Sequence, residues 1–169
     1  MHILFVGGQF PQLTFIFRMV RALAERGNRL TVAARGRGDW EPFRPYLPMP
    51  SGFSVRYLLP EVDLSDLRRL SALMAGLPVE IARSPRKAIR LWKTCRERTR
   101  TRSGALRMFI RYLPFLNLPR PDIIQFAFLP TATLYPWLGE LLDVPTVVSC
   151  RGSDLHMLEV QHPERRRNR

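Results

Sequence analysis

The sequence is poor in the residues that form disulfides and bind metals, with 2 cysteines and 3 histidines among 169 residues. Two cysteines are too few for a disulfide framework, so Cys95 and Cys150 are expected to be reduced thiols. The histidines, His2, His156 and His162, have no spacing to a cysteine or to each other that is typical of a metal site. These absences argue against a disulfide-stapled domain and against a metalloenzyme.

Long apolar segments are also missing. No stretch approaches the roughly 20 apolar residues of a membrane-spanning helix. The apolar N-terminus, residues 1–8, is too short for a signal peptide and has no basic segment before it. We therefore expect a cytoplasmic protein. The charge described next suggests, in addition, that it could attach peripherally to the inner face of the membrane.

Acidic residues are scarce: 14 Asp and Glu stand against 27 Lys and Arg, which gives a net charge of +13. The excess is concentrated. Residues 81–120 carry 12 cations and 1 anion, whereas residues 1–80 carry 10 and 7, and residues 121–169 carry 5 and 6. Such a segment attracts phosphates, anionic lipid or nucleic acid. The alternative is that arginine, 25 of the 27 cations, reflects only a GC-rich genome.

The basic segment contains apolar anchors, and basic helices with such anchors bind anionic membrane surfaces. The predicted membrane contacts are Arg86, Lys87, Arg90, Trp92 and Lys93. The alternative is a solvated helical face whose aromatic residues belong to the core. No nucleic-acid signature is present, so binding to RNA is supported by charge alone.

The first third of the chain has the pattern of a strand, a helix and a second strand. Residues 3–6 predict a buried strand that ends at Gly7-Gly8, and residues 30–34 predict the next strand. Between them Thr14 is a candidate N-cap and Gly27 a candidate C′ residue. The apolar face expected of this helix comprises Ile16, Met19, Val20 and Leu23.

Further elements follow behind a loop at residues 35–52. We expect a strand at 53–59, placed at an edge, and a leucine-rich helix at 64–77. A basic helix is expected at 85–98, with an inward face of Ile89 and Trp92 that could extend to Ala88 and Cys95. A short helix interrupted at Pro114 is expected at 105–116. Two strands at 122–128 and 144–150, joined by a helical link, indicate a parallel βαβ unit. The fold class predicted is α/β, with a doubly wound, mostly parallel, Rossmann-like sheet.

Ligands of open parallel sheets bind at the carboxyl ends of the strands. Arg151-Gly-Ser-Asp154 follows the last predicted strand, so Arg151 and Asp154 could hold an acceptor hydroxyl or phosphate, or form a local ion pair. Gly7-Gly8 could let a ligand approach the backbone, or provide a tight turn. Because Gly-x-Gly-x-x-Gly is absent, we predict no nicotinamide cofactor; Arg35, a possible 2′-phosphate ligand, is that cofactor's only support.

Three stretches resemble glycosyltransferase family 4, the retaining, nucleotide-sugar-dependent enzymes of the GT-B type. Phe10-Pro-Gln-Leu-Thr-Phe-Ile16 with Ala22-Leu-Ala-Glu-Arg-Gly27 is similar to the family's first loop and helix. Pro121-Asp-Ile-Ile124 is similar to its Pro-Asp-Ile-Ile-His strand. Val147-Val-Ser-Cys-Arg-Gly-Ser-Asp-Leu155 is similar to its strand end with His/Arg-Gly-x-Asp.

The sequence departs from the family pattern in four places. The usual Ser-Glu pair before Thr-Phe-Ile is absent, Gln125-Phe-Ala-Phe128 replaces His-x-His-Phe, and Arg151 replaces the more frequent His. The family's C-terminal domain, which binds the sugar nucleotide and carries two glutamates separated by seven residues, has no counterpart here.

The resemblance implies an acceptor-binding N-terminal domain at residues 1–155 and a polar basic tail, a truncated linker, at 156–169. It implies acceptor contacts by Gly7, Gly8, Phe10, Thr14, Arg151, Gly152 and Asp154, with no catalytic residue, no metal and no cofactor of its own. Partners implied for the full enzyme are a nucleotide sugar, a sugar or lipid-linked acceptor, and the missing domain or a partner chain.

This resemblance predicts a role in polysaccharide or glycolipid biosynthesis, with no activity by the chain alone. The alternative function is a non-enzymatic basic module that binds an anionic membrane or, less favoured, RNA. A folded remnant without a role is a further alternative.

Overall fold

The computed structural model describes residues 1–12, 14–57, 78–79, 81–116 and 118–150. Its elements run in the order β1 (His2–Phe10), α1 (Thr14–Glu25), β2 (Arg29–Arg37), η1 (Glu41–Tyr46), β3 (Phe53–Tyr57), α3 (Pro85–Arg98), α4 (Arg102–Tyr112), η2 (Leu113–Phe115), β4 (Ile123–Phe126), α5 (Leu129–Leu134), α6 (Leu138–Leu142) and β5 (Thr146–Val148). The predicted helix at 64–77, the residues 58–59 of the third predicted strand and the tail lie outside the described residues.

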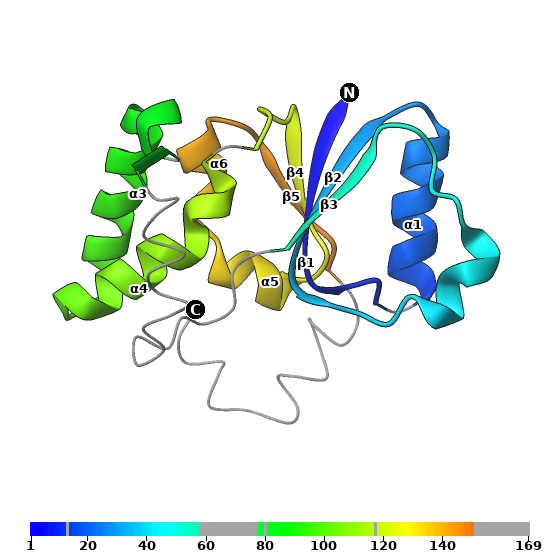
Figure 1. Ribbon diagram of the computed structural model, residues 1–169, viewed down its shortest axis with the longest axis horizontal. Helices are drawn as coiled ribbons and strands as arrows, with labels where there is room; N and C mark the ends of the chain where they lie inside the picture. Colours follow the sequence, from blue (N-terminus) through cyan, green and yellow to red (C-terminus); the bar gives the residue numbers. More distant parts are fainter. Residues whose placement is uncertain (13, 58–77, 80, 117, 151–169) are drawn as a thin grey trace.

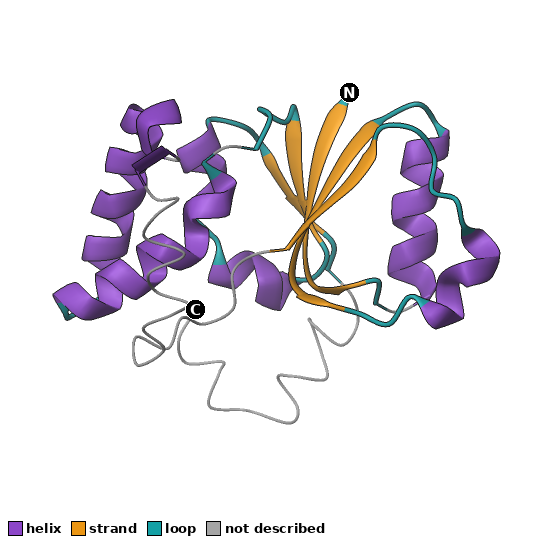
Figure 2. Ribbon diagram, viewed as in Figure 1, coloured by secondary structure: helices purple, strands orange, loops and turns teal. Residues whose placement is uncertain are grey.

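The described strands form a five-stranded sheet in the order β3-β2-β1-β4-β5, and each pair of neighbours is parallel. Helices cover both faces of this sheet (Figures 1 and 2). The predicted α/β class with a doubly wound, Rossmann-like sheet is therefore confirmed. The predicted edge position of β3 and the parallel pairing of β4 with β5 are confirmed as well.

One face of the sheet is covered by α1 and η1, on the right in Figure 1. Successive side chains of β1 and β2 point to opposite faces of the sheet. Phe5 and Val32 lie on this face, where they join Phe17 and Val20 of α1. The inward face predicted for α1 is confirmed: Ile16 and Val20 are buried, and Met19 and Leu23 pack against this core. Gly27 ends the helix with φ of 80°, as expected of a C′ residue.

The opposite face is covered by α4, η2, α5 and α6, and α3 forms an outer layer packed on α4 and α6 (Figure 1). Leu4, Val6 and Ile124 of the sheet belong to this second core. Its centre is aromatic: Tyr112 lies 4.9 Å from Trp137 and 5.5 Å from Tyr135 between ring centroids. The aromatic side chains here are therefore core residues, except Trp92, which is 38% exposed.

The amino end of the sheet is joined by buried polar contacts. The His2 ring lies 2.9 Å from Thr31 Oγ1 through Nε2 and 3.1 Å from the Arg120 carbonyl oxygen through Nδ1. The backbone N–H of His2 donates to Asp122 at 2.6 Å. These contacts connect the central strand to both of its neighbours and leave the carboxyl ends of the strands at the other side of the molecule.

Two predictions about local structure are wrong. The first strand does not end at Gly7-Gly8 but continues to Phe10, because Gly7 pairs with Ala34 and Gln9 with Gly36 of β2. In α3 the predicted bounds and the burial of Ala88 and Cys95 are confirmed, but Ile89 is 69% exposed and Trp92 38% exposed. Leu91 is buried instead. The buried residues at 88, 91 and 95 define the inner face of that helix.

Candidate functional site

The carboxyl ends of β1 and β4 form the candidate site. β1 leads to α1 on one face of the sheet, whereas β4 leads to α5 and α6 on the other face (Figure 1). Neighbouring parallel strands whose connections leave to opposite faces create a crevice between them, and such crevices bind ligands in open α/β sheets. Here Val6 pairs with Phe126, and the Ala127 N–H donates to the Val6 carbonyl oxygen at 3.0 Å.

Gly7 and Gly8 lie near the carboxyl end of β1 beside this crevice, Gly7 buried and Gly8 half-buried. They belong to a strand, and the glycines with positive φ in the described chain are Gly27 and Gly52. A Cβ at Gly7 would lie 3.8 Å from the Phe5 ring, and one at Gly8 would lie 3.5 Å from the Gln12 side chain. Both are ordinary contacts, so neither a tight turn nor crowding by the described protein atoms explains the two glycines.

Polar side chains border the same edge. Gln125 of β4 donates through Nε2 to Ser149 Oγ at 2.8 Å, which joins β4 to the chain just after β5. Gln125 stands where the resembled family has the first imidazole of His-x-His-Phe, and the sequence did not predict its pairing with Ser149. Its signal in the sequence is a lone amide within the apolar strand 123–126. The amide and the hydroxyl supply donors and acceptors for sugar hydroxyls.

Arg35 lies at the carboxyl end of β2 with its side chain exposed. Burial raises the pKa of Tyr135 to about 12, and Tyr112 acts in the same direction, while the charges of Arg35 and Arg111 lower it. Burial likewise raises the pKa of Tyr112, against the effect of nearby arginines that include Arg35. Arg35 thus acts on both tyrosines in the direction opposite to burial.

The other residues predicted for the site have different positions. Phe10 is 1% exposed and packs against Phe17, Trp40 and Phe53, so its ring belongs to the core and offers no surface to a ligand. Thr14 is the first residue of α1. Arg151, Gly152 and Asp154 lie outside the described residues; the last described residue before them, Cys150, is exposed.

The predicted membrane contacts lie on α3. Arg86, Arg90 and Lys93 are exposed, whereas Lys87 is half-buried. Trp92 is 38% exposed and packs edge-on against Phe109 of α4, with ring centroids 5.6 Å apart. By helical spacing Arg86, Ile89, Lys93 and Arg96 share the outward face. Ile89, which was predicted to face the core, is therefore an apolar side chain on a basic surface.

The described residues contain no group of three or more metal-ligating side chains. Within the same residues no helix is long and apolar enough to cross a membrane.

The fold and the crevice define a Rossmann-like α/β protein. No family model matches the chain, and no curated protein matches it. Among solved structures the chain is similar to the C-terminal domain of a hydrogenase from Pyrococcus furiosus, at 14% identity and a TM-score of 0.42, over 88% of this chain and 89% of that one. A similarity this low carries no argument about family or activity.

Proposed function

We propose that this chain is the acceptor-side domain of a retaining, nucleotide-sugar-dependent glycosyltransferase of family 4, acting in polysaccharide or glycolipid assembly. The observation that carries the proposal is the pair Gly7-Gly8, held in extended backbone at the crevice between β1 and β4 with no steric need for glycine among the described atoms. Glycine at such a place lets a bound sugar approach the main chain. The motifs at residues 10–27, 121–124 and 147–155 support the same family.

In this proposal the crevice orients an acceptor hydroxyl. The main chain at Gly8 forms the floor, and Gln125 with Ser149 provides side-chain hydrogen bonds at the wall. Arg151 and Asp154 would complete the site from the chain that follows Cys150. Alignment of two substrates requires both walls of a cleft.

Cleavage of the bond to a nucleoside diphosphate develops negative charge on the leaving phosphate, which needs cations and backbone donors. In the resembled family a separate donor domain supplies these groups. Activity is therefore expected only when such a domain, in the same chain or another, faces the crevice.

The test joins this chain to the donor domain of a family 4 enzyme and follows transfer of labelled sugar from a nucleotide sugar to lipid-linked acceptors. Transfer is expected from the joined protein and not from the chain alone. Gly8→Val should abolish transfer with little change in thermal stability, because the added methyl groups enter the crevice. The matched control is Gly36→Ala on β2, where a Cβ would meet only the flexible side chain of Gln9 at 3.4 Å.

Turnover by the chain alone, or full transfer by the Gly8→Val protein, contradicts the proposal.

A second candidate function is binding to an anionic membrane surface, and the exposure of Ile89 favours it. An isoleucine 69% exposed among Arg86, Lys93 and Arg96 matches the pattern of an interfacial helix. The protein should co-sediment with vesicles that contain anionic lipid and should stay in the supernatant with neutral vesicles. Ile89→Asp should weaken retention, whereas Leu47→Asp, a control at a residue that is 44% exposed and caps the end of η1, should not.

Equal effects of the two substitutions contradict a specific membrane face. Salt-dependent retention on RNA without retention on vesicles would favour the RNA-binding alternative instead.

A further inference from the structure

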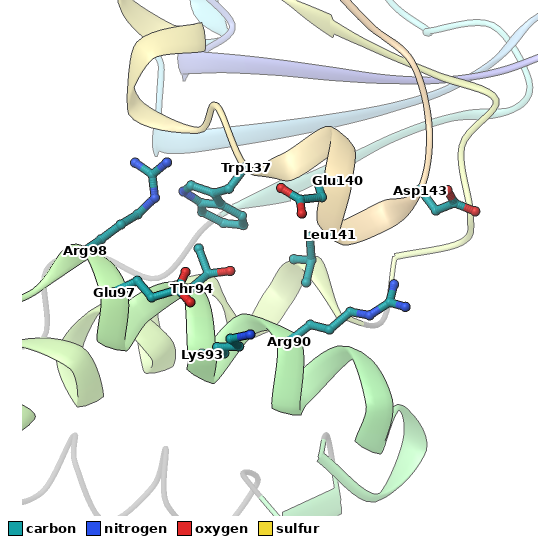
Figure 3. A pocket seen from close by; sticks show the side chains of 9 residues that line it. All are labelled: Arg90, Lys93, Thr94, Glu97, Arg98, Trp137, Glu140, Leu141 and Asp143. Atoms are coloured by element: carbon teal, nitrogen blue, oxygen red, sulfur yellow. The ribbon is translucent and has the colours of Figure 1, made fainter.

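A cavity of about 560 Å³ lies between α3 and α6, outside the crevice described above. Figure 3 shows its wall: Arg90, Lys93, Glu97 and Arg98 extend from α3, and Trp137 and Glu140 lie across from them at α6. Its volume is within the range of small-molecule sites, about 300–1,000 Å³. None of its residues belongs to the candidate site at the carboxyl ends of the strands.

The indole nitrogen of Trp137 has no hydrogen-bond partner. Trp137 is 4% exposed, and Nε1 is the one buried side-chain nitrogen or oxygen without a partner in the described part of the chain. An indole N–H can only donate, and a buried donor without an acceptor is unfavourable. Nε1 has less than 1 Å² of accessible surface, so it is closed to a ligand, and Trp137 serves instead as a reporter of whether the cavity is occupied, since other atoms of this residue line it.

The cavity also holds cations that lack an ion-pair partner. Among the described residues no carboxylate lies within 4.0 Å of the charged nitrogens of Arg90, Lys93 or Arg98. Asp143, at the rim, is paired with Arg120 at 3.1 Å. Figure 3 shows the nitrogen-bearing edge of the Trp137 indole turned toward Arg98. In the described part of the chain these three cations therefore keep their donors for a ligand anion.

The remaining groups accept hydrogen bonds. Glu97 and Glu140 line the cavity without an ion pair in the described structure, and Thr94 adds a hydroxyl. Carboxylates without a cation partner accept well from ligand hydroxyls. Three cations against two unpaired carboxylates leave the cavity with a net positive charge, which suits a ligand with one anionic group and several hydroxyls.

We propose that the cavity between α3 and α6 binds a sugar phosphate. The phosphate accepts from the Arg98 guanidinium, within the field of Arg90 and Lys93. Arginine and lysine are the usual partners of phosphate oxygens. Glu97 and Glu140 accept from sugar hydroxyls. This site is separate from the acceptor crevice, so neither proposal depends on the other.

The test follows the indole N–H signals of the full ¹⁵N-labelled chain by NMR. The chain has 3 tryptophans, and the signal absent from the Trp137→Phe protein identifies Trp137. Glucose 6-phosphate should shift that signal with a midpoint below about 1 mM. Glucose and inorganic phosphate should each need at least about tenfold higher concentration, because each offers only one half of the interactions.

Matched variants on one helix make the test specific. Arg98→Ala should raise the midpoint for glucose 6-phosphate by about tenfold or more, whereas Arg96→Ala, at an exposed arginine that does not line the cavity, should change it by less than about twofold. Both side chains are exposed, so folding should survive either change.

No shift of the Trp137 signal at about 10 mM glucose 6-phosphate would overturn the proposal. Equal effects of Arg96→Ala and Arg98→Ala would overturn it too, because binding would then follow overall charge. An equal midpoint for inorganic phosphate and glucose 6-phosphate would show that the sugar contributes nothing to binding, and would overturn the proposal of a sugar phosphate site.

Discussion

The carbonyl oxygen of Pro11 lies where a side chain on Gly38 would begin, since a Cβ at Gly38 would be 1.8 Å from that oxygen. The Gly38 N–H also donates to the Phe10 carbonyl oxygen at 3.0 Å, so the ends of β1 and β2 pass in direct backbone contact.

Gly38→Ala should therefore be strongly destabilising. Relief of the clash requires movement of backbone rather than of a flexible side chain, and overpacking of this kind costs about 1–3 kcal/mol. Gly8→Ala is the matched control, because its Cβ would meet the Gln12 side chain at 3.5 Å. Urea unfolding of both variants checks the prediction, which a stable Gly38→Ala protein would contradict.

The inner and outer faces of α3 should differ in their sensitivity to truncation. Leu91 is fully buried, whereas Ile89 is 69% exposed. Leu91→Ala should cost about 2–5 kcal/mol through lost burial and a cavity, and Ile89→Ala less than about 1 kcal/mol. Thermal or urea unfolding measures both, and a larger loss at Ile89 would reverse the assigned orientation of the helix.

Removal of the hydroxyl of Thr31 should destabilise the amino end of the sheet. Thr31→Val keeps the shape of the side chain but leaves the buried Nε2 of His2 without its partner at 2.9 Å, at a cost of about 1–3 kcal/mol. Thr133→Val is the control, since Thr133 Oγ1 donates to the Pro130 carbonyl oxygen at an exposed position. Equal stability of the two variants would show that the His2 contact contributes nothing.

The protein should lose stability at alkaline pH. Burial raises the pKa of Cys95 from 9.0 to about 12 and that of Tyr135 from 10.0 to about 12, and raises the pKa of Tyr112 as well. The native state thus keeps protons that the unfolded chain has lost. Stability is full below about pH 9 and falls above it, by about 1.4 kcal/mol per pH unit for each group ionised only in the unfolded chain.

Urea unfolding at a series of alkaline pH values measures this slope. Cys95→Val should make the slope smaller because it removes one of the three groups. An unfolding free energy that stays constant up to pH 11 would contradict the burial of these groups.

The two thiols should differ in reactivity. Cys150 is exposed, whereas Cys95 is buried and its high pKa keeps the thiol protonated. The thiolate is the reactive form. Alkylation of the native protein at neutral pH should add one label, at Cys150, and alkylation in denaturant should add two. Mass spectrometry distinguishes these outcomes, and labelling of native Cys95 would indicate that α3 opens readily.

The sequence predicts best where local signals agree. The bounds of α3 were predicted correctly. Pro85 marks the start of the helix, and a run of residues with helical propensity follows it. Likewise Gly27, between an apolar helical face and an apolar strand, marked the end of α1. The parallel arrangement followed from apolar strands separated by helix-length links.

Long-range contacts explain the errors. Gly7-Gly8 has the local composition of a turn, but pairing with β2 and the hydrogen bond from Ala127 to Val6 keep the chain extended. In α3 the choice between Ile89 and Leu91 depends on where α4 and α6 pack. For the same reason the cavity beside Trp137 could not be anticipated, because its two walls are formed by segments about forty residues apart.

The position of Met1 has a practical consequence. β1 begins at residue 2 in the middle of the sheet, and with about 3.3 Å per residue its glycine pair lies about 20 Å from the N-terminus, at the opposite end of the strand. An affinity tag or a dye attached at Met1, which is 64% exposed, would stay clear of the crevice. Immobilisation of the protein on a sensor surface through that end would present the crevice to solution.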